Sequence, residues 1–110
     1  MAVQVTLYID QGTHFTAEVT LTNYDGTPLN LDGFTVRGQM RRSYYSRTST
    51  VFTAAVSDAA AGLITISLND TQTAALKPGR YVYDVEIVGP SAVSRAVEGI
   101  VVVSPEVTRA

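Results

Sequence analysis

The architecture follows most directly from Leu76-Lys77-Pro78-Gly79-Arg80-Tyr81-Val82-Tyr83-Asp84-Val85. A Pro-Gly turn stops the chain, and an alternating strand begins at once, with a tyrosine two residues after the glycine. A tyrosine in this place turns the corner between the two sheets of a β-sandwich, because its ring packs inward and its hydroxyl bonds to backbone upstream. The stretch therefore predicts a structural corner formed by Leu76, Pro78, Gly79 and Tyr81.

Outward from this corner, apolar and polar residues alternate in about seven short runs, as expected of half-buried strands. The expected strands are residues 3–9, 15–22, 34–41, 52–56, 64–68, 81–87 and 93–103. A short helical turn is expected near 70–76, with Asn69 or Asp70 as its cap. Turn signals about every 8–12 residues indicate an all-β, immunoglobulin-like antiparallel β-sandwich, with an eight-stranded barrel as the alternative.

The length of 110 residues suits one domain, which we place at 1–104, followed by a flexible C-terminal tail at 105–110. Charged residues make up 16% of the chain, against about 25% in typical soluble domains. A surface with few full charges is easy to desolvate. This composition indicates either extensive protein contacts or simply a Thr-rich β-protein.

Several function classes are not expected. A net charge of −2 argues against a nucleic-acid partner, and the absence of cysteine excludes disulfides and thiolate metal sites. The N-terminus lacks the features of a signal peptide, and no apolar run approaches the ~20 residues that cross a membrane. We expect no catalytic residue, no cofactor and no metal.

The few residues that suggest chemistry have simpler explanations. His14 is the only histidine and lies in a turn with no nearby nucleophile, so we expect an exposed residue at the start of a strand. Asp84 and Glu86 share one strand face, a spacing that would suit acid–base catalysis or Ca²⁺. We favour a solvated strand face opposite Arg or Thr.

The loop at residues 41–47 stands out because it combines basic and aromatic side chains. With Arg37, it holds half of the eight basic residues beside two adjacent tyrosines. Arg and Tyr are enriched at protein interfaces, and they also suit polyanions or glycans. The alternative is a hairpin whose rings fold over the sandwich edge. The interface candidates are Arg37, Arg41, Arg42, Tyr44, Tyr45 and Arg47.

The order of strands and turns resembles small structural proteins of tailed bacteriophages. The resemblance lies in residues 10–12, 15–22, 25–41, 58–65, 76–81 and 98–103, and so covers nearly the whole chain. The family is that of the N-terminal domain of phage baseplate upper proteins, including stand-alone versions in phages of cyanobacteria. It implies an immunoglobulin-like sandwich that docks fibres or receptor-binding proteins.

From this resemblance we expect a non-enzymatic virion protein, assembled in the host cytoplasm, that acts as an adaptor or scaffold in the tail, baseplate or fibre-attachment region. Its partners would be other virion proteins, in a symmetric multi-copy assembly. No coiled coil or receptor-binding domain follows the sandwich in this sequence, which favours a piece fitted between larger parts. The alternatives are a capsid decoration protein and a carbohydrate-binding adhesion module with Tyr8, Tyr24, Tyr44 and Tyr45 as stacking residues.

Overall fold

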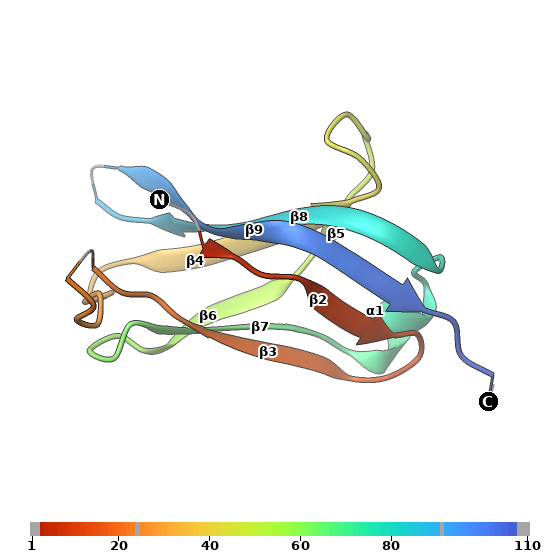
Figure 1. Ribbon diagram of the computed structural model, residues 1–110, viewed down its shortest axis with the longest axis horizontal. Coiled ribbons are helices and arrows are strands. Elements are labelled where there is room, and N and C mark those ends of the chain that lie inside the picture. The colour runs from red at the N-terminus through yellow and green to blue at the C-terminus, as the bar shows by residue number, and fades with distance from the viewer. Residues whose placement is uncertain (1–2, 24, 91, 108–110) are drawn as a thin grey trace.

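The computed structural model describes residues 3–23, 25–90 and 92–107. The two sheets face each other (Figure 1). The first strands are β1 (Val3–Gln4), β2 (Leu7–Asp10), β3 (Phe15–Thr20) and β4 (Thr35–Arg41). They are followed by β5 (Thr50–Val51), β6 (Thr53–Asp58), β7 (Leu63–Leu68), β8 (Gly79–Val88) and β9 (Val93–Ser104). Within these described ranges there is one helix, α1 (Asp70–Ala74), which lies between β7 and β8.

The larger sheet has the order β1-β9-β8-β4-β5, with β2 also on β9, and the smaller sheet has the order β3-β7-β6. This is an all-β, immunoglobulin-like sandwich, and the predicted fold class is confirmed. The seven expected strands become nine segments because one of them is interrupted and because β5 is a short strand that was not expected. Residues 3–10 break into β1 and β2, and the chain changes sheets at Phe52, between β5 and β6.

The first strand departs from antiparallel pairing. Both β1 and β2 run parallel to β9, whereas the other pairs are antiparallel. A short turn carries the chain from β2 to β3 in the opposite sheet. The Gln11 amide bonds to the Ser104 carbonyl at 2.9 Å and continues the pairing into the turn.

The interruption between β1 and β2 is built around the carbonyl of Val5. The Tyr83 hydroxyl donates to this oxygen at 2.6 Å, and the Val5 amide donates to the Glu98 carbonyl at 3.0 Å. Gly99 lies so close that an added Cβ would overlap the same oxygen. The first strand therefore bends where Gly99 makes room and Tyr83 supplies a donor.

The core fills the space between the sheets with inward side chains from both. Its fully buried members include Ile9, Leu31, Met40, Ile64, Ile66, Leu68, Val85, Val97 and Val101. An aromatic cluster crosses the sandwich: the Phe52 ring centroid lies 6.4 Å from that of Phe15 and 6.1 Å from that of Tyr83, edge-on to the latter. Burial of these side chains, rather than any covalent link, holds the two sheets together.

The predicted helical turn is confirmed, and its cap is Asn69. The Asn69 side chain accepts a hydrogen bond from the backbone N–H of Gln72 at 2.8 Å. In return, the Gln72 side chain accepts one from the backbone N–H of Asn69 at 2.8 Å. This reciprocal pair is a capping box. At the other end of the chain, the Glu106 amide bonds to the Gln11 side chain at 3.1 Å, so the first part of the predicted tail contacts the body. Residues 108–110 lie outside the described residues.

Candidate protein interface

The loop after β4 projects from the body of the sandwich (Figure 1) and ends in a tight turn at residues 43–46, the tyrosine turn. The Ser46 amide bonds to the Ser43 carbonyl at 3.2 Å, and the Ser43 amide bonds to the Ser46 hydroxyl at 3.1 Å. Tyr44 and Tyr45 occupy the two central positions, with 77% and 95% of their surfaces exposed. Both rings are therefore largely open to solvent.

Arg41 fixes the base of the tyrosine turn. Its guanidinium donates to the Ser46 carbonyl at 2.8 Å and to the Gln39 side chain at 2.9 Å. A charged donor makes a stronger hydrogen bond than a neutral one, so this contact ties the turn firmly to β4. Arg41 therefore orders the loop rather than standing free as an interface residue.

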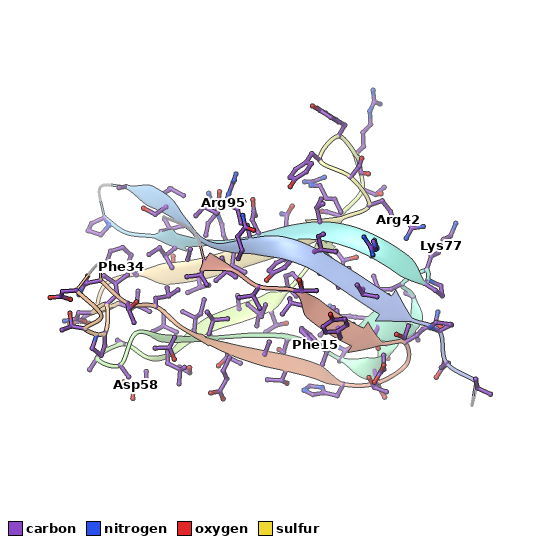
Figure 2. All side chains as sticks on the ribbon, viewed as in Figure 1. Phe15, Phe34, Arg42, Asp58, Lys77 and Arg95 are labelled. Atoms are coloured by element: carbon purple, nitrogen blue, oxygen red, sulfur yellow. The ribbon has the colours of Figure 1, made fainter. Side chains whose placement is uncertain are left out.

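Arg42 points away from the tyrosine turn, toward the predicted structural corner. Its guanidinium lies 4.9 Å from the centroid of the Tyr81 ring, and it donates to the Pro78 carbonyl at 3.3 Å. An added Cβ at Gly79, where φ is +132°, would lie 2.6 Å from the Arg42 Nη1 atom. Figure 2 shows Arg42 beside Lys77 at this end of β8.

The corner itself has the geometry that its sequence suggests. The Tyr81 ring is buried, and its hydroxyl donates to the Lys77 carbonyl at 2.6 Å, four residues upstream. Leu76 is buried beneath it. Arg42 therefore covers the corner, with its charge over the ring face, where a cation is attracted by the ring quadrupole.

Arg37 and Arg47 are the other two arginines of the candidate set, and they differ in their contacts. Arg37 on β4 pairs with Glu86 on β8, with 2.7 Å between Nε and Oε1. Arg47 is exposed, and no hydrogen bond or ion pair joins it to another described residue. Of the six candidates, Tyr44, Tyr45 and Arg47 are the side chains most available to a partner.

A shallow groove of about 450 Å³ runs across the outer face of the larger sheet, from Tyr44 and Val51 toward β9. We call it the outer groove. Its charged side chains form an ion-pair network in two separate parts: Arg37 pairs with Glu86, and Arg95 lies 3.4 Å from Asp84 and 3.6 Å from Glu98. The predicted solvated face for Asp84 and Glu86, opposite arginine, is confirmed.

Sequence reasoning missed Arg95 and Glu98 as members of this network. The register between β8 and β9 shifts after Val85, so that Val97 pairs with Val85 but Arg95 pairs with Glu86. The extra residue, Ala96, is buried next to buried Val97, which breaks the alternation along β9. Only the acidic pair at Asp84 and Glu86 gave a signal in the sequence.

His14, Tyr8 and Tyr24 are the remaining residues that the sequence suggested as functional candidates. The His14 side chain is exposed and shares a hydrogen bond of 3.0 Å with the Thr16 hydroxyl, as expected for a strand-start residue. Tyr8 is exposed on β2 and does not line the outer groove. Tyr24 lies outside the described residues.

Metal-binding clusters and membrane-spanning helices are both absent from the described residues. They hold no group of three or more His, Asp or Glu side chains arranged to bind a metal ion. Nor does any helix within the described ranges have the length and apolar character needed to cross a bilayer.

Comparisons with known proteins inform the fold alone. No protein-family model matches the chain, and a search of curated proteins finds no match either. A crystal structure of InlP from Listeria monocytogenes matches 94% of this chain, with a TM-score of 0.50 and 16% sequence identity. The match spans 28% of the InlP chain. This chain is thus similar to a part of InlP in its β-sandwich architecture.

Proposed function

We propose that this protein is a non-enzymatic structural component of a tailed-phage virion, an adaptor in the tail, baseplate or fibre-attachment region that works through protein contacts. The proposal begins from the resemblance of its strands and turns to the N-terminal domain of phage baseplate upper proteins. The observation that carries it is the tyrosine turn, where Tyr44 and Tyr45 stand 77% and 95% exposed on a backbone fixed by Ser43, Ser46 and Arg41.

Such a turn has the properties of an interface anchor. Tyrosine brings a large apolar surface and a polar hydroxyl at a low cost in side-chain entropy. Because the turn is already ordered, a partner need not spend binding energy on ordering it. Arg47 beside the pair adds an exposed charge for the rim of a contact.

The rest of the sandwich surface supports an assembly role. On the outer face of the smaller sheet, one cross-strand row consists of Thr16, Ser67 and Thr53, and the next consists of Glu18, Thr65 and Ala55. Small, uncharged side chains lose little hydration energy when a neighbour covers them. A capsid decoration protein would use the same features, so the location within the particle separates the two roles.

The direct test is to locate the chain in a density map of purified particles of the phage that encodes it. We expect it between tail, baseplate or fibre proteins, with the tyrosine turn against a neighbour. A position on the capsid lattice would select the decoration role. Absence from the particles, or a tyrosine turn that faces solvent there, contradicts the proposed function.

A matched set of variants tests the turn itself. The double variant Tyr44→Ala, Tyr45→Ala should weaken docking to the neighbour found in the map by roughly 30-fold or more, which is the loss of about 2 kcal/mol typical of a hot spot. Tyr8→Ala, which removes an exposed ring elsewhere, serves as the control. Equal binding by wild type and the double variant would remove the turn from the interface.

A carbohydrate-binding role is the second candidate, and one observation favours it. Tyr44 lines the outer groove together with Gln39 and the ion-paired Asp84 and Arg95, a combination of an aromatic face and hydrogen-bonding groups. Binding on a glycan array that is lost in Tyr44→Ala and Gln39→Ala but kept in Tyr45→Ala, a residue outside the groove lining, would support it. No binding by the wild-type domain would exclude it.

A further inference from the structure

Among the described residues, one edge of the smaller sheet has no partner strand. Within residues 3–23, 25–90 and 92–107, β3 pairs with β7 and with no other strand. In constant-type immunoglobulin sandwiches, the first strand lies in the same sheet as the second, fourth and fifth. Here the first strand, as β1 and β2, pairs with β9 instead. The place beside β3 is therefore vacant.

The hydrogen-bond register shows which backbone groups face this vacant place. Thr20 pairs with Leu63, and at the next position the Leu21 amide bonds to the Gly62 carbonyl at 2.7 Å. In an antiparallel ladder, residues alternate between bonding to the neighbouring strand and pointing away from it. The odd-numbered residues of β3 thus bond to β7. Thr16, Glu18 and Thr20 present their N–H and C=O groups to the open edge.

The other sheet edges have features that protect them, and β3 has fewer. β1 and β2 are interrupted at Val5, β5 is two residues long, and β6 has an irregularity between Val56 and Asp58. β3 runs for six residues without proline, lysine or bulge. Natural sandwiches usually blunt a regular edge of this kind, because it is a template for another strand.

We propose that β3 pairs antiparallel with β3 of a second copy of this chain, across a two-fold axis. The strand is self-complementary, because Phe15, Ala17 and Val19 face the core side while Thr16 and Thr20 face outward. Pairing joins the two smaller sheets into one continuous sheet across the axis. The inference deepens the proposed assembly role, on which its biological meaning rests, by naming a neighbour and the surface it uses.

Glu18 sets both the register and the strength of this pairing. A two-fold axis at Glu18 would place the two carboxylates directly opposite each other, which is unfavourable. An axis at Ala17 places Glu18 opposite Thr16 of the second copy and leaves the carboxylates as diagonal neighbours, about 7–8 Å apart. The remaining repulsion makes the dimer weak and concentration-dependent, so that it forms where many copies are held close together.

Sedimentation of the wild-type protein over a range of concentrations tests the proposal. Thr16→Pro removes an N–H that points to the open edge and leaves the bonds to β7 in place, so it should weaken the dimer by at least about tenfold. Thr16→Val keeps that N–H and should dimerise like wild type. Glu18→Gln removes the carboxylate repulsion and should tighten the dimer several-fold.

Hydrogen exchange gives a reading that needs no variant. As concentration rises, the amides of Thr16, Glu18 and Thr20 should gain protection, while those of Ala17 and Val19 are protected throughout. A protein that stays monomeric, or a dimer that a folded Thr16→Pro leaves intact, overturns the β3 proposal. Neither result touches the tyrosine turn, since the Tyr44→Ala, Tyr45→Ala protein keeps the β3 edge and should still dimerise.

Discussion

Tyr81 and Tyr83 on β8 differ in every surrounding from Tyr44 and Tyr45 on the tyrosine turn, although all four are the same side chain. The β8 pair is 8% and 4% exposed, whereas the turn pair is 77% and 95% exposed. Each β8 hydroxyl donates to a backbone carbonyl at 2.6 Å, Tyr81 to Lys77 and Tyr83 to Val5. A buried hydroxyl needs a hydrogen-bond partner. Here each hydroxyl donates to a carbonyl that lies at a bend in the backbone.

The two pairs show that the same side chain can stabilise the fold in one place and stay exposed to solvent in another. On β8, the ring and the hydroxyl both contribute to folding, one by packing and the other by bonding to a bent backbone. On the turn neither contributes to the stability of the domain, yet Ser43, Ser46 and Arg41 hold the backbone in order. An ordered turn that carries two exposed aromatic rings is what the proposed interface role requires.

Truncation of one ring from each pair tests this comparison most severely. Tyr83→Ala should lower the free energy of unfolding by about 3–5 kcal/mol, because it empties a core site beside Phe52 and leaves the Val5 carbonyl without its donor. Tyr45→Ala should change it by less than about 0.5 kcal/mol. Denaturant melts of the two variants measure both values, and similar losses would erase the distinction between the pairs.

Alkaline pH gives a second, weaker test of the buried Tyr83. Burial raises the pKa of Tyr83 from 10.0 to about 12. The folded state therefore holds the Tyr83 proton more tightly than the unfolded state does, so this stabilisation is complete below about pH 10 and is lost as the pH approaches about 12.

Tyr83→Phe should have a flatter stability profile than wild type across this window, since phenylalanine has no proton to lose. The variant starts lower at neutral pH, by about 1–2 kcal/mol, because the Val5 carbonyl loses its hydrogen bond. Chemical melts between pH 8 and about pH 12 supply the slopes, and parallel profiles for wild type and Tyr83→Phe would contradict the assignment.

Much of the fold was predictable because local signals agreed with the global arrangement. Alternation placed Ile64, Ile66 and Leu68 on the core face, and the capping residues placed α1. The Pro-Gly-x-Tyr pattern at the corner predicted that the Tyr81 hydroxyl bonds to the upstream backbone. In each case the residues that make the structure are neighbours in the sequence.

The features that escaped prediction depend on contacts between distant segments. The parallel direction of β2 is a property of its partner β9, and the break at Val5 requires Tyr83, which is 78 residues away. The ion pairs of Arg95 depend on the register shift after Val85, which no local pattern announces. Arg42 was an interface candidate because it is close to Tyr44 in the sequence. Its position in the chain gave no indication that it covers the Tyr81 ring.

The smallest predicted effect concerns Arg42 and Arg47. Arg42 contacts the corner at Tyr81, whereas Arg47 lies next to the tyrosine turn. Arg42→Ala should lower the free energy of unfolding by about 0.5–1 kcal/mol, because it removes a cation from the face of the Tyr81 ring and a donor from the Pro78 carbonyl. Arg47→Ala should leave stability unchanged within about 0.5 kcal/mol. Arg42→Lys should recover only part of the loss, since an ammonium cannot lie flat on the ring as a guanidinium does. Midpoints of denaturant melts resolve these differences. If Arg42→Ala is as neutral as Arg47→Ala, Arg42 belongs with the tyrosine turn, and the division of the loop into a part that serves the corner and a part that serves a partner fails.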